Sequence, residues 1–252
     1  MIILIFNRKF LMIWGILSLS AIYLGAKTPV GGVNGAVDVS FKAGKLIEVA
    51  FLSVKPGKEN QLNADYFAKV MPIAAEYGMR PLATFGVTDV AEGNTHVQMI
   101  GFFEWPSIEV RNKFSRDKRF LAIKPIRDNA LSYLQYGFFK VEEDVSTTFS
   151  ADHYYEIYAM WMNPKYGNQI SDYFGKVGPV AGQHYGAKFP LSLKPYGGKD
   201  GDYHPHAMGI AEWPSKAKNE AFFNSPVFKD ARHLRDAAVD RLDALHARVV
   251  VQ

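Results

Sequence analysis

The chain of 252 residues contains no cysteine. Disulfides, thiolate catalysis, iron–sulfur clusters and cysteine-based zinc sites are therefore excluded, and the fold can form in an oxidising compartment without wrong pairings. A large excess of charge is missing too, since 29 Lys and Arg against 25 Asp and Glu give a net charge of only +4. The basic residues form no stripe and no nucleic-acid-binding motif occurs, so we expect no nucleic-acid partner.

Motifs of several enzyme classes are also absent. The sequence has no Gly-rich phosphate loop, no serine nucleophile elbow and no zinc-protease helix with paired histidines. These absences leave binding modules and enzymes whose chemistry needs none of these motifs.

One long apolar run lies near the N-terminus. Phe10–Ala26 contains 17 residues without a charge and follows the basic pair Arg8-Lys9. This order is typical of a secretory signal or a signal anchor, and the run is at the short end for crossing a bilayer, so cleavage and retention are both open. We predict an exported protein, periplasmic or membrane-anchored facing outward, that meets the membrane only through this segment.

The chain contains an internal repeat with an offset of 108 residues. Glu104-Trp105-Pro106-Ser107 returns as Glu212-Trp213-Pro214-Ser215, and the same offset pairs Tyr77-Gly78 with Tyr185-Gly186. Agreement over about a hundred positions indicates a duplicated unit. The predicted organisation is a signal or anchor at 1–27, a tether at 28–45, repeat 1 at 46–142, a linker at 143–152 and repeat 2 at 153–252.

Each repeat has the order strand, helix, strand, strand, helix, strand. Leu46–Val54 and its counterpart Tyr154–Met162 are rich in β-branched and aromatic residues, which is typical of strands. The order predicts an α+β fold of two tandem ferredoxin-like (βαββαβ) repeats. Because helices would cover only one face of each sheet, we expect the two sheets to pack together as an intrachain α+β barrel.

Repeat 2 contains a recognisable set of residues: Glu212 to Ser215, Phe222, Asn224-Ser225-Pro226, Phe228 and Arg235. This set resembles the signature of the uncharacterised domain family 1330 of the dimeric α+β barrel superfamily. Members of that superfamily usually pair two chains, so the resemblance implies a monomer with an internal pseudo-dimer, with a higher assembly open. The superfamily includes cofactor-independent monooxygenases, haem-binding enzymes and small isomerases, and therefore implies a fold and a pocket but no single reaction.

Polar residues on the third strand of each repeat are candidates for chemistry. Residues two apart in a strand share a face, which places His204, His206 and Glu212 together in repeat 2, and His96 and Glu104 together in repeat 1. A carboxylate beside an imidazole is a usable acid–base pair, so the predicted catalytic residues are Glu212, His204 and His206. The structural alternative is a bond from each glutamate to the start of the following helix or to Arg127 or Arg235, with the histidines at the solvent-exposed entrance of the strand.

Repeat 2 is richer in aromatic residues than repeat 1. Tyr154, Tyr158 and Trp161 stand where repeat 1 has Leu, Ala and Ser. Aromatic walls suit a flat apolar ligand, so we place the pocket in repeat 2. The predicted ligand-binding residues are Tyr154, Tyr158, Trp161, Tyr173, Trp213, Arg235, His96 and Glu104.

No cofactor is expected and no metal ligands are assigned. His204 and His206, with Glu156 or Glu212, form only a weak metal pattern because a site needs a third convergent ligand and supporting contacts. A bound haem would need an axial ligand, for which the candidates are His184, His233 and His246.

Two functions stay open from the sequence. The first is a binding or structural module without catalysis that holds a small apolar or aromatic molecule or a protein partner. The second is a cofactor-independent enzyme, monooxygenase-like or isomerase-like, that acts on a small organic substrate through Glu212 and His204 or His206.

Overall fold

The computed structural model describes residues 35–198 and 200–251. The predicted signal or anchor and most of the predicted tether lie outside these residues, so export stays a prediction. Among the helices of the described residues, none is long and apolar enough to cross a membrane.

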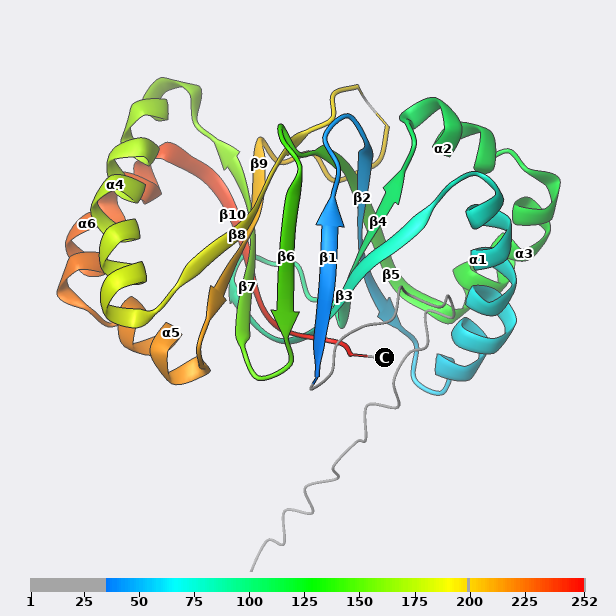
Figure 1. Cartoon of the computed structure of the whole chain (residues 1–252), viewed down its shortest axis with the longest axis horizontal. Helices are drawn as coiled ribbons and strands as arrows, with labels where there is room; N and C mark the ends of the chain where they lie inside the picture. Colours follow the sequence, from blue (N-terminus) through cyan, green and yellow to red (C-terminus); the bar gives the residue numbers. More distant parts are fainter. Residues whose placement is uncertain (1–34, 199, 252) are drawn as a thin grey trace, which may run out of the picture.

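Eight strands form a closed barrel, to which each repeat contributes four neighbouring strands (Figure 1). Around the barrel these are β3 (Arg80–Glu92), β4 (Met99–Trp105), β2 (Leu46–Val54) and β5 (Leu131–Lys140) of repeat 1, then β8 (Lys188–Pro195), β9 (Ala207–Trp213), β7 (Tyr154–Met162) and β10 (Val239–Val249) of repeat 2. The repeats meet at two seams, β10 with β3 and β5 with β8. The predicted α+β class is confirmed, and the elements follow the predicted order.

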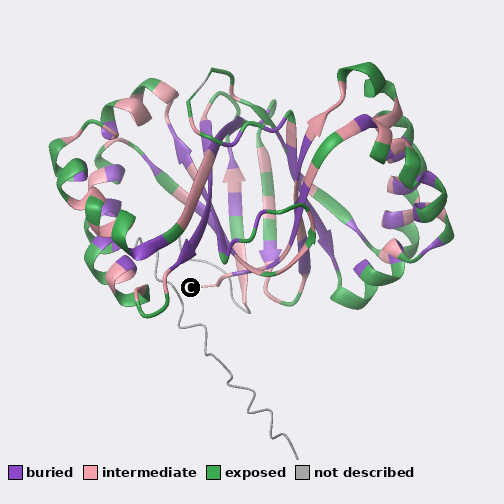
Figure 2. Ribbon diagram, turned by 180° about the vertical axis from the view of Figure 1, so that it is seen from behind, coloured by how far each residue is buried: buried purple, intermediate pink, exposed green. Residues whose placement is uncertain are grey.

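Helices cover the outer face of each sheet, at opposite ends of the long axis (Figure 1). They are η1 (Gln61–Phe67, π-helical), α1 (Ala68–Glu76), α2 (Ile108–Phe114) and α3 (Lys118–Ala130) in repeat 1, and η2 (Pro164–Tyr166), α4 (Gly167–Tyr185), α5 (Lys216–Phe223) and α6 (Pro226–Ala238) in repeat 2. Ser107 and Ser215 start α2 and α5, because each side-chain oxygen accepts a hydrogen bond from the backbone N–H three residues later. Exposed residues collect on the outer sides of these helices and buried residues in the strands (Figure 2).

The barrel interior is one apolar core shared by both repeats. The ring of Phe85 packs edge-on against Phe102 of its own repeat at 5.7 Å between centroids, and against Tyr155 of repeat 2 at 5.3 Å. The inner faces of the two sheets therefore bury each other, which is the packing that the duplication predicted.

The segments predicted as tether and linker each contain a strand. β1 (Ala36–Phe41) pairs antiparallel with β6 (Val145–Ser150) to form a separate two-stranded ribbon in front of the barrel (Figure 1). Val39, Phe41 and Phe149 of this ribbon are buried in the barrel core. Sequence reasoning missed both strands because each is only six residues long.

We predict that the ribbon contributes strongly to stability. Phe149 is fully buried and its ring packs on Phe85 and Tyr155. Phe149→Ala should lower the free energy of unfolding by about 3–5 kcal/mol, as truncation of a buried aromatic does. Ser146→Ala, on the exposed face of β6, should change it by less than about 0.5 kcal/mol. Urea denaturation measures both, and equal small effects would show that the ribbon is not part of the cooperative core.

Candidate functional site

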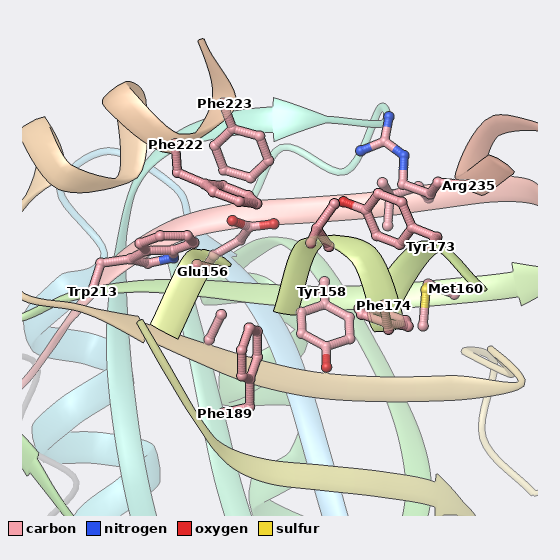
Figure 3. A pocket seen from close by; sticks show the side chains of 14 residues that line it. Glu156, Tyr158, Met160, Tyr173, Phe174, Phe189, Trp213, Phe222, Phe223 and Arg235 are labelled. Carbon is pink, nitrogen blue, oxygen red and sulfur yellow. The ribbon is translucent and has the colours of Figure 1, made fainter. Parts of the chain in front are cut away.

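A cavity of about 60 Å³ lies between the sheet and the helices of repeat 2 (Figure 3). One water molecule needs roughly 10–15 Å³ of such space, so the cavity can hold several waters or a small organic group. Much of its wall is aromatic, and includes Tyr158, Tyr173, Phe174, Phe189, Trp213 and Phe223. Glu156 and Arg235 add the charged groups.

Repeat 1 has larger side chains at two corresponding positions. Phe103 and Arg111 of repeat 1 correspond, at the offset of 108 residues, to Ala211 and Asn219 of repeat 2. Ala211 lines the cavity. Asn219 donates a hydrogen bond to the carboxyl group of Glu156. At these two positions repeat 1 thus carries a phenyl ring and a guanidinium where repeat 2 has smaller groups.

Glu156 and its counterpart Glu48 have different partners. Glu48 accepts a hydrogen bond from Trp105 Nε1 at 2.8 Å and forms an ion pair with Arg111 Nη2 at 3.2 Å. Glu156 has only Asn219 Nδ2 at 3.4 Å as a hydrogen-bond partner among the described residues. The same carboxyl is thus ion-paired in repeat 1 and held by a single weak contact in repeat 2.

The surroundings of Glu156 favour its neutral form. Burial raises the pKa of the Glu156 carboxyl to about 7, against the opposing effects of the Asn219 hydrogen bond and the Arg235 charge. The nearby carboxylate of Glu92 raises it further. Near neutral pH this group can therefore donate or accept a proton.

Three buried polar atoms next to Glu156 lack a hydrogen-bond partner among the described residues: Trp213 Nε1, Asn219 Oδ1 and His246 Nε2. Trp213 lies beside Glu156 in the cavity wall (Figure 3), Asn219 contacts its carboxyl, and His246 is its direct neighbour across the β7–β10 ladder. An unmatched buried polar group costs about 1–3 kcal/mol. These three atoms together therefore cost stability in repeat 2.

His246 is oriented from the other repeat. Its Nδ1 makes a hydrogen bond with Asp89 of β3, and Asp89 also accepts from Tyr154 Oη at 3.1 Å and Lys216 Nζ at 3.2 Å. The imidazole of His246 is thus held by a residue of repeat 1, and its Nε2 is buried.

Arg235 also joins the cavity to repeat 1. It is buried, and its Nη2 lies 2.8 Å from Glu92 Oε1 of β3 and 2.9 Å from Asp236 Oδ1. Tyr173 lies beside Arg235 in the cavity wall (Figure 3), and burial raises the pKa of its hydroxyl, which therefore keeps its proton.

The structure brings some of the predicted site residues together. Those that line the cavity are Tyr158, Tyr173, Trp213 and Arg235. Tyr154 lies beside the cavity, and its hydroxyl group donates a hydrogen bond to Asp89. Trp161 belongs to the opposite face of the sheet, where its ring packs on Tyr203 at 5.1 Å and under the Arg241 guanidinium at 4.0 Å.

The predicted acid–base pairing of Glu212 with His204 and His206 is not formed. Both histidines precede β9, because the strand starts one residue after His206 and not at His204. His206 Nδ1 accepts from the backbone N–H of Met162 at 2.8 Å. Glu212 lies near the other end of β9, roughly 20 Å from His206 at the usual rise of a strand.

The two strand-end glutamates are ion-paired, but not to the arginines of the last helix. Glu212 lies 2.9 Å from His153 Nδ1 and 3.4 Å from Lys188 Nζ, and Glu104 lies 2.7 Å from Arg80 Nη2. His96 is exposed and precedes β4. Glu104 and Glu212 therefore have structural partners away from the cavity.

The histidines considered for metal or haem are dispersed. Within the described part of the chain, no group of three or more His, Asp or Glu is arranged to hold a metal ion. His184 and His233 are exposed, and His246 is bound to Asp89. No histidine is among the residues that line the repeat 2 cavity. The expectation that the protein needs no cofactor stays a prediction.

Sequence reasoning underrated Glu156, Asn219 and Asp89. The signal for the first two was present in the repeat itself, because Glu48 and Glu156 correspond while Arg111 and Asn219 do not. Asp89 carried no such signal, since its contact with His246 depends on the register of the β3–β10 seam.

The indole N–H groups of the two repeats should differ in their effect on stability. Trp105→Phe and Trp213→Phe remove similar volume, but only Trp105 donates to a carboxylate. We expect Trp105→Phe to lower the free energy of unfolding by about 1–3 kcal/mol more than Trp213→Phe does. Chemical denaturation of both variants tests this, and equal losses would contradict the unpaired state of Trp213.

Stability should depend on the protonation of Glu156. Because its pKa rises from 4.5 to about 7 on folding, the protonated form is favoured in the folded state, and stability is lost as pH rises from 4.5 through 7. Relative to Glu156→Gln, which stays neutral, the parent protein should lose about 3 kcal/mol over this range. Denaturation curves from pH 4 to 8 measure the difference, and parallel pH profiles would contradict it.

Solved structures share the fold at low sequence identity. An anthrone oxidase-like protein superposes with a TM-score of 0.60 at 17% identity, over 85% of this chain and 94% of its own. A mutant chlorite dismutase from Candidatus Nitrospira defluvii superposes with a TM-score of 0.52 at 9% identity, over 83% of this chain and 93% of its own. Such likeness shows a common α+β barrel fold and says nothing about activity. No curated protein matches the sequence.

The family that the sequence resembles matches twice. The domain described as "Domain of unknown function (DUF1330)" covers residues 50–135 and 155–246, one match in each repeat. The two matches together span well over half of the chain. The protein therefore belongs to the DUF1330 family and carries two copies of its domain in tandem.

Proposed function

We propose that the protein binds a small, flat, largely apolar molecule in the repeat 2 cavity. The observation that carries this proposal is the difference between the repeats. Glu48 is neutralised by Arg111, whereas Glu156 faces an aromatic cavity with Asn219 in place of the arginine. A site with aromatic walls and a few convergent polar groups is typical of small-molecule pockets.

A purely structural role explains this arrangement less well. In repeat 1 both the Glu48 carboxylate and the Trp105 indole N–H have partners, and the same fold accommodates this arrangement. The repeat 2 version leaves polar atoms unmatched at a cost in stability. A cost of this kind is common at sites kept for function.

An acid–base enzyme is the second candidate, and one observation favours it. A carboxyl with a pKa of about 7 suits a general acid or base at neutral pH. In this version Glu156 takes the role that the sequence suggested for Glu212. Glu156→Gln separates the candidates, because it should spare ligand affinity in a binding protein and abolish turnover in an enzyme.

The cavity should bind toluene as a simple aromatic probe. Asn219→Arg restores the residue of repeat 1, so the guanidinium should pair with Glu156, occupy the cavity and weaken toluene binding at least tenfold. Phe189→Ala removes a half-exposed side chain from the cavity wall. It should weaken toluene binding roughly threefold, because part of an apolar contact is lost.

Leu121→Ala is the matched control, since Leu121 is as exposed as Phe189 (48% against 47%) but lies on α3 of repeat 1. Ligand-observed NMR titration on the full chain measures all four proteins. Equal toluene affinity in the parent, Asn219→Arg and Phe189→Ala proteins would locate binding elsewhere, and no binding to the parent protein would refute the proposal.

A further inference from the structure

We infer that the molecule bound in the repeat 2 cavity is a small aromatic cation, a flat ring that bears an amidine, a guanidine or a protonated amine. This inference rests on the proposed function, because it names the chemical class of the ligand for the same cavity. The positive group pairs with the carboxyl of Glu156, which lines the cavity and lies beside Trp213 and Phe222 (Figure 3).

Repeat 1 shows which group this carboxyl position accepts. The Glu48 carboxylate pairs with the Arg111 guanidinium, whose Nη2 lies 3.2 Å from Oε1 and whose Nε lies 3.3 Å from Oε2. Both side chains are largely buried. The guanidinium also lies over the rings of Tyr136 and Phe138, at 4.9 Å from each centroid. A flat cation held between a carboxylate and aromatic rings is therefore already part of this fold.

Repeat 2 keeps the carboxyl but has no cation paired with it. Asn219 occupies the position of Arg111 and donates to Glu156 only through a neutral amide, at 3.4 Å. Within the described residues, Glu156 forms no ion pair, and burial raises the pKa of its carboxyl to about 7. Because a buried carboxylate without a cation is costly, a ligand that brings a positive charge gains the energy of pairing it.

Arg235 does not take the place of the missing cation. It lines the cavity, but its Nη2 lies 2.8 Å from Glu92 Oε1 and 2.9 Å from Asp236 Oδ1. Its single positive charge is therefore already shared by two carboxylates before Glu156 is counted. When all three carboxyls are ionised, three negative charges face one positive charge, and the field at the cavity favours a cation over an anion.

Aromatic rings surround the cavity at positions where repeat 1 has none. Three residues of the cavity wall stand where repeat 1 has Ala, Pro and Ser, namely Tyr158, Phe189 and Phe223. They replace the rings under the guanidinium of repeat 1, because Tyr136 and Phe138 correspond to Ala244 and His246. Ring faces attract a positive group and stack on a flat aromatic one, so the wall suits both parts of an aromatic cation.

Other classes of ligand fit the cavity less well. An anion would add to the excess of negative charge. A neutral aromatic molecule would fill the apolar part of the cavity but leave Glu156 without a cation. A metal ion needs several convergent ligands, and no such group occurs in the part of the chain that the structure describes.

Benzamidine and benzamide form a nearly isosteric pair that tests the inference, because benzamidine is a cation at pH 8 and benzamide is neutral. Ligand-observed NMR titrations on the full chain at pH 8, above the pKa of about 7 of Glu156, give the affinity of each probe. We expect benzamidine to bind the parent protein at least about tenfold more tightly than benzamide, the effect of one charge-assisted hydrogen bond.

Glu156→Gln removes the negative charge at nearly unchanged shape. It should lower the benzamidine-to-benzamide affinity ratio about tenfold and leave the affinity for toluene nearly unchanged. Glu220→Gln is the matched control, because it removes the same charge from an exposed residue of α5 that does not line the cavity. This control should leave the ratio as it is.

Asn219→Arg keeps the test decisive if Glu156→Gln does not fold. Repeat 1 shows that the fold accommodates an arginine at this position. The new guanidinium should occupy the cavity, as for toluene, and also take the carboxylate of Glu156. Benzamidine affinity should therefore fall about tenfold further than toluene affinity does.

The outcomes separate the inference from the proposed function. Toluene binding together with equal affinities for benzamidine and benzamide would overturn the cation assignment and leave the binding function intact. A preference for benzamidine that survives Glu156→Gln, or that Glu220→Gln lowers equally, would also overturn it. Failure of toluene, benzamide and benzamidine alike to bind the parent protein would refute the function, and the inference with it.

Discussion

The structure depends on one constraint, which is that each four-stranded sheet has an inner face that its own helices cannot cover. The helices of a ferredoxin-like unit lie on one side, so the other side must be buried by something else. Here the second copy of the unit buries it, and Phe85 of repeat 1 against Tyr155 of repeat 2 is the central contact. The ribbon of β1 and β6 adds Phe41 and Phe149 to the same core.

Because the shared core lies inside the barrel, the outer layers of the two repeats are free to differ. In repeat 1 the layer between sheet and helices is closed by Phe103 and by the ion pair of Arg111 with Glu48. In repeat 2 this layer contains a cavity, and a carboxyl with a raised pKa lines it. The difference arises from a few substitutions outside the core, so it leaves the contacts between the sheets in place.

Much of the architecture was predictable because repeats and periodicity are local signals. The Glu-Trp-Pro-Ser segments gave the offset of the repeat, and the β-branched and aromatic residues of Leu46–Val54 indicated a strand. The register was not predictable: it moved His204 and His206 off the strand and set His246 opposite Glu156. Tyr158, Tyr173, Trp213 and Arg235 were identified by composition, whereas Asp89 joins the site only through contacts between distant segments.

The seam between β10 and β3 gives the fused chain a property that a homodimer lacks. Asp89 and Glu92 of repeat 1 hold His246 and Arg235 of repeat 2, so each half of the chain has a distinct task. In a symmetric dimer every substitution appears in both copies, and a change that opens one site also weakens its twin. Covalent fusion removes this coupling. One half can specialise as a scaffold while the other changes its chemistry. The corresponding positions Arg111 of repeat 1 and Asn219 of repeat 2 show such a difference within a single polypeptide.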